Sequence, residues 1–320
     1  MSGRVYSRTN PAQSASRPND VGTFHEGERA VQKRAGVAAE ARSLGRGISS
    51  VIPPGVGSFL EAQRIAILAG MDARGRVWAS IVTGKPGFIT APDGRTLSLA
   101  ATLPDADPLH GSLAGDIPLG VLVLDPERRR RIRLNGRASS ERPGVIDIRI
   151  EEVFGNCPKY IQARAPAREA GSNHGTGTGL RGVALSASQG LAIERADTFF
   201  IASTNGEAGA DASHRGGQPG FVQVVDDKRL RFPDYAGNNM FQTLGNITTD
   251  PRIGILFVDF DAGTTLHLTG RARVLWDRED FLDLPGAERA VEVEIDEVVE
   301  TAGQGPFGWR LLDYSPFNPR

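Results

Sequence analysis

The sequence predicts a mainly β protein made of two similar β units in tandem, with short helices beside each unit. Two observations support this. In a chain of 320 residues, 39 glycines and 20 prolines separate many short apolar runs, which is typical of all-β domains. The chain also repeats itself, because the stretch 67–99 matches 200–232 at an offset of 133 residues. A length of 320 residues suits two domains of about 150 residues each.

Further repeated segments follow in the same order along both units. "LGVLVLD" (119–125) matches "IGILFVD" (253–259), "LNGRA" (134–138) matches "LTGRA" (268–272), and "VIDIRIEEV" (145–153) matches "AVEVEIDEV" (290–298). Ile146 and Ile148 alternate with charged residues, as in a half-buried strand. Helices are predicted at 27–44, 55–63 and 184–196. Short strands bounded by turns indicate barrels or sandwiches.

Composition excludes several classes of protein. A net charge of −1 argues against nucleic-acid and membrane-surface binding. No apolar run reaches the roughly 18 residues of a membrane span. Cys157 is the single cysteine, which fits a reducing cytoplasm. The five histidines lack metal-ligand spacing, so no metal site is predicted. Residues 1–23, rich in Arg and Ser, are expected to be a disordered tail, with a transit peptide as the alternative.

Four segments of the second unit give the chain a family resemblance. They are "ADTFFIAS" (196–203), "DASHRGGQPGFVQV" (211–224), "FPDYAGNNMFQTLGN" (232–246) and "DPRIGILFVDF" (250–260). With them the chain resembles the pyridoxamine 5′-phosphate oxidase-like superfamily of FMN-binding split barrels, in its two-barrel branch.

The resemblance implies two tandem split β-barrels related by a pseudo-twofold axis. The expected divisions are a helix and connection at 24–54, barrel one at 55–165, a flexible linker at 166–184, barrel two at 185–300 and a C-terminal extension at 301–320. Barrels of this superfamily normally dimerise and hold FMN between them, so a two-barrel chain is expected to be a monomeric pseudo-dimer or a homodimer.

The resemblance places the FMN phosphate on the second barrel. Ser213 and Arg215 share a strand, Tyr235 is kept, and Asn238 and Asn239 stand where the oxidases of the family carry Arg and Lys. The helix start at Gly237–Asn239 is expected to hold the phosphate, since helix N-termini bind anions. In barrel one the corresponding stretch carries Asp105 and Asp107, which predicts a degenerate phosphate half.

The second half of the site is expected after barrel one. "FGNCPKYIQAR" (154–164) has no counterpart in the second unit, and the resemblance directs it towards the flavin of the partner barrel. Reduced flavin carries negative charge at its N1/O2 edge, where cationic and amide donors stabilise it. The predicted donors are Asn156, Lys159, Tyr160 and Gln162. Cys157 is expected to be a packed thiol.

Other motifs receive simpler interpretations. "GTGLRG" (177–182) fits a dinucleotide fingerprint, but no strand precedes it. "RRRRIRL" (128–134) is expected to be a turn entering a solvated strand. His214 is expected on the strand face opposite Arg215. His25 and Glu26 could cap the first helix or line the site.

The predicted function is an FMN-dependent oxidoreductase of unknown substrate, with an external electron donor such as NAD(P)H or a reductase. A non-catalytic flavin carrier or redox sensor is the first alternative. A split-barrel protein that uses haem or a deazaflavin is the second.

Overall fold

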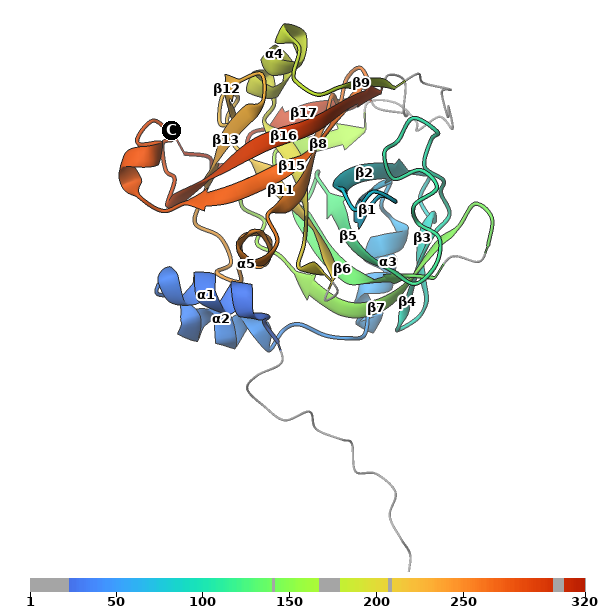
Figure 1. Cartoon of the computed structure of the whole chain (residues 1–320). Coiled ribbons are helices and arrows are strands. Elements are labelled where there is room, and N and C mark those ends of the chain that lie inside the picture. Colours follow the sequence, from blue (N-terminus) through green and yellow to red (C-terminus); the bar gives the residue numbers. More distant parts are fainter. Residues whose placement is uncertain (1–22, 140–141, 167–178, 207–208, 302–307, 320) are drawn as a thin grey trace, which may run out of the picture.

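Two β-sheets, one from each repeat, dominate the computed structural model of the chain (Figure 1). The structure describes residues 23–139, 142–166, 179–206, 209–301 and 308–319. Residues 1–22 of the predicted disordered tail, 1–23, and residues 167–178 of the predicted linker, 166–184, lie outside the described residues.

The first sheet has the strand order β2-β1-β5-β6-β7-β4-β3. Its strands are β1 (Ile65–Met71), β2 (Val77–Thr83), β3 (Ile89–Asp93), β4 (Thr96–Leu99), β5 (Ile117–Asp125), β6 (Arg130–Ala138) and β7 (Ile146–Gly155). In β7 the buried Ile146, Ile148 and Ile150 alternate with more exposed residues, as predicted from the sequence.

The second sheet repeats that order strand for strand, as β11-β10-β14-β15-β16-β13-β12. Its strands are β10 (Thr198–Thr204), β11 (Ala210–Gly216), β12 (Gln223–Asp226), β13 (Arg229–Asp234), β14 (Arg252–Val258), β15 (Thr265–Leu275) and β16 (Arg289–Thr301). A register shift falls after Asn135 in one sheet and after Thr269 in the other, which are equivalent positions. The two units are therefore copies of one split barrel, and the predicted fold class is confirmed, with seven strands in each path.

The barrels contact each other through a shared apolar cluster. Members of this cluster come from β1, β2 and β5 of one barrel and from β10, β11 and β14 of the other. A Cβ at Gly120 would lie 2.7 Å from the Ala210 carbonyl oxygen, and a Cβ at Gly254 would lie 2.5 Å from Cα of Trp78. Because these glycines occupy equivalent positions, the backbones approach closely at two pseudo-symmetric points.

The helices lie around the barrels as α1 (Glu26–Arg34), α2 (Ala38–Gly45), α3 (Gly57–Glu61), α4 (Ala187–Arg195) and α5 (Gln242–Thr249), with 3₁₀ turns η1 (Pro54–Val56) and η3 (Arg278–Phe281). The helix predicted at 27–44 is broken into α1 and α2, since Gly36 has a φ of +75° between them. Helix α1 packs on α5 at Gly27 and Gly245 (Figure 1).

Three short strands complete the fold. β8 (Ala163–Pro166) pairs with β17 (Trp309–Asp313), and β9 (Leu180–Gly182), which falls within the predicted linker, pairs with β16. Trp309 is buried in the apolar cluster between the barrels. The C-terminal strand is thereby attached to the chain that leaves barrel one.

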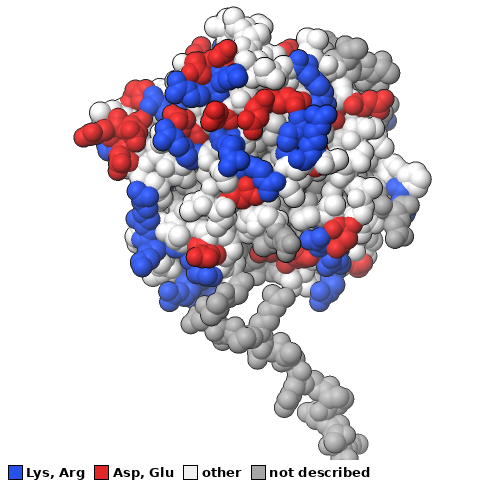
Figure 2. All heavy atoms as spheres, viewed as in Figure 1, with Lys and Arg blue, Asp and Glu red and all other residues white. Residues whose placement is uncertain are grey.

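Charges of both signs are mixed on the face shown in Figure 2. Over β15 and β16, Arg273 pairs with Glu292 at 2.7 Å, and Arg181 pairs with Glu297 at 2.7 Å. Among the described helices, none combines the length and apolar character that a membrane crossing requires.

Candidate functional site

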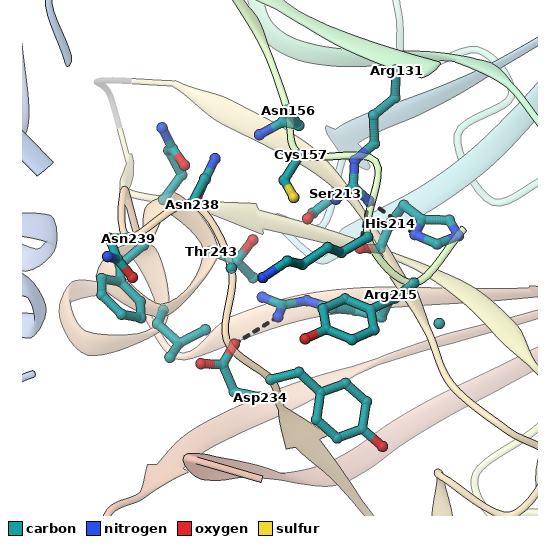
Figure 3. Close-up of a pocket in the computed structure, with 18 of the residues that line it drawn as sticks. Arg131, Asn156, Cys157, Ser213, His214, Arg215, Asp234, Asn238, Asn239 and Thr243 are labelled. Carbon is teal, nitrogen blue, oxygen red and sulfur yellow. Dashed lines mark hydrogen bonds and ion pairs between the residues drawn. The ribbon is translucent and has the colours of Figure 1, made fainter. Parts of the chain in front are cut away.

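A hollow lined by residues of both barrels is the candidate site (Figure 3). Its walls come from β6 of barrel one, the segment that follows β7, strand β11, the end of β13 and the first turn of α5. Eight of the nine predicted site residues line it, namely Asn156, Lys159, Tyr160, Ser213, Arg215, Tyr235, Asn238 and Asn239. Its volume of about 80 Å³ suits a small polar group.

Arg215 lies in the wall contributed by β11. Its Nη1 donates to Oδ1 of Asp234 at 2.7 Å, and its Nε is buried without a hydrogen-bond partner among the described residues (Figure 3). Asp234 also accepts from Nε of Arg289 at 3.0 Å. Because a guanidinium has five N–H donors and the bond to Asp234 uses one of them, Arg215 keeps donor capacity for a further acceptor in the hollow.

Two arginines from barrel one enter the same hollow, and the sequence interpretation missed both. Arg133 donates to Asp211 at 2.9 Å and to Oγ of Ser213 at 2.7 Å. Arg131 donates to Nδ1 of His214 at 2.9 Å. The Nε atoms of Arg131 and Arg133 are buried and have no partner in the described part of the chain.

The prediction of a solvated strand at 128–134 is therefore wrong for this face of β6. Ile132 and Leu134 do point into the core of barrel one, as their alternation indicates. The opposite face is covered by β11 of barrel two, so Arg131 and Arg133 lie between barrels. The sequence did contain a signal for the burial of these arginines. In a tandem repeat whose two barrels pack against each other, a strand such as β6 can have both faces buried, so the polar face of an alternating strand need not be exposed.

Burial lowers the pKa values of two side chains in the hollow, Arg131 and His214. Burial, together with repulsion by Arg133 and Arg215, lowers the pKa of Arg131 to about 9. The pKa of His214 lies well below its usual value because the ring is buried and arginines surround it. His214 is therefore neutral, and its Nδ1 accepts a hydrogen bond from Nη1 of Arg131. It was expected to point away from Arg215, and it does take the opposite strand face, but that face also borders the hollow.

The start of α5 differs from the predicted one. The helix begins at Gln242, three residues after Asn239. Asn239 and Phe241 have φ values of +58° and +60°, and Oδ1 of Asn238 accepts from the Met240 amide at 3.2 Å. The two asparagines thus lie in a turn before the helix. The left-handed backbone of Asn239 and Phe241 could not be predicted from the local sequence preferences. The first turn of α5, without a side-chain cap, faces the hollow instead.

The segment after β7 closes the other side of the hollow. Tyr160 packs on Tyr235 with ring centroids 5.0 Å apart and donates its hydroxyl to the Ala236 carbonyl at 3.0 Å. Burial raises the pKa of Tyr235 to about 12 and also raises that of Tyr160, so both phenols remain protonated. Oδ1 of Asn156 is buried without a described partner, and Cys157 lies in the same wall.

Gln162 lies outside the hollow. It is 1% exposed, and its amide bonds to backbone and side-chain groups behind the segment. His25 also lies away from the lining residues. It caps α1 together with Glu28 and bonds to Asn246 at 2.9 Å, which answers the question that the sequence left open.

The pseudo-symmetric position between the barrels has a different chemistry. By the offsets of the repeat, Val82 stands for Arg215, His267 for Arg133 and Thr265 for Arg131. Ser80, the counterpart of Ser213, donates to Oδ1 of Asp107 at 2.7 Å.

That carboxyl group also caps the local turn. Oδ1 of Asp107 accepts from the Leu109 amide at 2.8 Å, and burial raises the pKa of Asp107. Asp105, by contrast, is fully exposed beside His110 and takes no part in this arrangement. The pseudo-symmetric position therefore has no arginine at these three equivalents, and the Asp107 carboxylate accepts from Ser80 and from the Leu109 amide there.

Within the described residues, no cluster of three His, Cys, Asp or Glu side chains is arranged to hold a metal ion. The hollow is instead rich in guanidinium groups, hydroxyls and helix-end amides, which is the donor set for a phosphate or carboxylate.

Comparisons with solved structures give low overall similarity. HupZ of Group A Streptococcus is 12% identical, with a TM-score of 0.32, over 39% of this chain and 100% of its own. The FAD binding protein of Mycobacterium smegmatis is 15% identical, with a TM-score of 0.27, over 37% and 95% of the two chains. A Clostridium acetobutylicum protein described as related to general stress protein 26, of the pyridoxinephosphate oxidase family, is 12% identical, with a TM-score of 0.28, over 38% and 89%.

The comparison with family models is the informative one. No curated protein matches the chain. Residues 190–306 match the model of the family described as pyridoxamine 5′-phosphate oxidase. This range spans barrel two and includes the strand β11 and the helix α5 that form one side of the hollow. The match to the pyridoxamine 5′-phosphate oxidase family model therefore falls on the second of the two copies of the split-barrel topology.

Proposed function

We propose that the hollow binds the phosphate of FMN and that the protein is an FMN-dependent oxidoreductase. The observation that carries this proposal is the meeting of three arginines in one hollow between the barrels, each with a buried Nε that has no hydrogen-bond partner among the described residues. Unpaired buried donors are costly in a folded protein, and a bound anion removes that cost.

The charge of the hollow suits a phosphate monoester. Asp211 and Asp234 compensate Arg133 and Arg215. In the described part of the chain, neither Arg131 nor Lys159 has a carboxylate at ion-pair distance. Arg131 in the hollow and Lys159 at its mouth thus leave two positive charges near a phosphate monoester, which carries about −1.5 to −2 at neutral pH.

The volume of the hollow suits only one part of FMN. Pockets for whole ligands usually measure about 300–1,000 Å³, whereas this hollow measures about 80 Å³. It therefore suits the phosphate, which Arg131, Arg215 and the first-turn amides of α5 would hold. The remainder of FMN would extend along the mouth, where Tyr160, Tyr235 and Lys159 lie.

When bound, FMN would supply the hydride-accepting chemistry. The protein would hold the phosphate and place a positive charge, Lys159, beside the mouth. The donor would be external, NAD(P)H or a reductase, and the single Cys157 fits the reducing cytoplasm that we assign to the protein. We assign it the oligomeric state of a monomeric pseudo-dimer, with a homodimer as the alternative.

A flavin carrier or redox sensor is the second candidate, and one observation favours it. His214 stays neutral and Tyr160 and Tyr235 stay protonated near neutral pH, so these three lining side chains do not change protonation state there. Steady turnover of NADH or NADPH with bound flavin separates an oxidoreductase from a carrier. The absorbance spectrum separates FMN from haem and from a deazaflavin.

The direct test of the phosphate site is Arg215→Ala. Loss of a charge-assisted hydrogen bond should weaken FMN binding by about 1.5–3 kcal/mol. Riboflavin, which lacks the phosphate, should bind almost equally to the wild type and the variant. Isothermal titration calorimetry with both ligands measures the difference.

Arg273→Ala is the matched control, because Arg273 also pairs with a carboxylate but lies on the outer face of β15. Equal losses for FMN and riboflavin in Arg215→Ala would show that Arg215 acts through folding, and the assignment of the phosphate site would then fail.

A further inference from the structure

The segment 156–162, which crosses from barrel one to barrel two, is held in a constrained conformation. Tyr160 has a φ of +67°, in the left-handed region that side chains other than glycine rarely occupy. A Cβ at Gly216 would lie 2.1 Å from the Tyr160 carbonyl oxygen, so the segment presses directly on β11. Such a backbone persists only where its surroundings hold it firmly.

Gln162 makes the first set of hydrogen bonds that keep the segment in place. Its Nε2 donates to the carbonyl oxygens of Gly217 at 3.0 Å, Tyr160 at 3.2 Å and Asp197 at 3.3 Å. Its Oε1 accepts from the Ser315 amide at 2.7 Å and from Nδ2 of Asn318 at 3.1 Å. One buried side chain thus connects the crossing segment, barrel two and the C-terminal residues.

The residues after β17 take part in the second set of hydrogen bonds that keep the segment in place. Oγ of Ser315 accepts from the Tyr160 amide at 3.1 Å, which satisfies the backbone of the constrained residue itself. Arg129 donates to the Ile161 carbonyl at 3.0 Å and to the Tyr314 carbonyl at 3.2 Å. The pairing of β8 with β17 brings these residues together, since β8 directly continues the crossing segment.

These hydrogen bonds fix the positions of Tyr160 and Lys159. Tyr160 packs on Tyr235 at the mouth of the hollow, and Nζ of Lys159 lies 5.6 Å from the centre of the Phe317 ring. Both residues line the hollow, whereas Gln162 and Ser315 do not.

We propose that Gln162 and Ser315 form a latch, in which they act as positioning residues that hold Tyr160 and Lys159 against barrel two and so complete the mouth of the site. The consequence for FMN binding rests on the proposed function. The consequence for the conformation of the segment does not.

The experiment compares Ser315→Ala with the wild type by amide hydrogen exchange and by FMN titration. Ser315→Ala removes the acceptor of the Tyr160 amide. Exchange in residues 156–162 should become at least about fivefold faster, while exchange in β6 and β15 stays unchanged. The Kd for FMN should rise by about fivefold or more, whereas the Kd for inorganic phosphate, which would contact only the arginine end of the proposed site, should change less.

Two further variants make the result specific to the latch. Ser315→Thr, which keeps a hydroxyl, should restore most of the protection. Leu312→Ala, at a half-exposed position on β17, is the matched control and should resemble the wild type. Gln162→Leu, if it folds, should produce a larger effect than Ser315→Ala.

Unchanged exchange in 156–162 of Ser315→Ala, or an equal increase in Leu312→Ala, would overturn the latch. If the wild type binds no FMN, the proposed function fails instead, and the exchange measurement still decides the latch.

Discussion

Glu28 is a single buried carboxyl group with a measurable effect on the whole protein. It lies in the first turn of α1, where it accepts from the His25 amide at 2.8 Å. Burial, reinforced by the nearby carboxylates Glu152 and Asp211, raises its pKa to about 8. The reference value is 4.5, so between these two values the folded protein binds a proton that the unfolded chain has released.

Because the folded state binds more protons in this window, the contribution of Glu28 to stability falls as the pH rises from about 4.5 to about 8. Glu28→Gln keeps an acceptor for the helix cap and removes the titration. The free energy of unfolding of the wild type, relative to the variant, should fall with pH at a slope approaching about 1.4 kcal/mol per unit.

Urea unfolding at several pH values across the window measures that slope, with Glu26→Gln, at an exposed carboxylate in the same turn, as the matched control. A pH-independent difference between the wild type and Glu28→Gln would contradict the assignment of a buried, protonated Glu28.

At the scale of elements, the contact between α1 and α5 positions one wall of the hollow. A Cβ at Gly245 would lie 2.6 Å from Cα of Glu28, and a Cβ at Gly27 would lie 2.2 Å from the Gly245 carbonyl oxygen. The two helices therefore meet backbone to backbone. Gln32 of α1 also donates to the Met240 carbonyl at 2.9 Å, just before α5 begins.

Gly245→Ala should accordingly destabilise the protein by about 1–3 kcal/mol, because backbone atoms would have to move. Gly190→Ala in α4 is the matched control, since its nearest neighbour is a Val224 methyl group at 3.8 Å. That change should stabilise the protein by about 0.5–1 kcal/mol. Chemical denaturation of both variants tests the pair, and equal effects would show that the helix contact is not tight.

Elements that depend on local pattern could be predicted from the sequence, whereas those that depend on the second barrel could not. The alternation at Ile146 and Ile148 was sufficient to predict β7, and the repeat was sufficient to predict the shared topology. The start of α5 was placed too early because the backbone of Phe241 is left-handed, against its intrinsic preference. Arg131 and Arg133 were missed because their burial comes from β11, which is distant in sequence.

The same distinction applies to the predicted site residues. Residues such as Ser213 and Lys159 were found because the family resemblance indicated their segments, and they do line the hollow. Gln162 lies behind the site, since the left-handed turn at Tyr160 redirects the chain and no sequence pattern signals that turn. The binding role of these residues stays a prediction.

For the molecule as a whole, the two inter-barrel positions predict unequal binding. One position presents arginines, and the other replaces them with Val82, His267 and Thr265 and caps its own turn with Asp107. The protein should bind one equivalent of FMN per chain, as measured by calorimetry or by the flavin content of the purified protein. Two equivalents of similar affinity would show that the position in barrel one is functional.

Arg133 on β6 donates hydrogen bonds to Asp211 and Ser213 on β11, so residues of both barrels form the hollow. This shared construction determines how the hollow responds to dilution of the protein. A pocket shared by two separate chains disappears when the chains dissociate, so its occupancy depends on protein concentration. Here both barrels belong to one polypeptide, and the effective concentration of each barrel around the other is set by the connecting chain. The hollow should therefore persist at dilutions at which an equivalent two-chain dimer would have come apart.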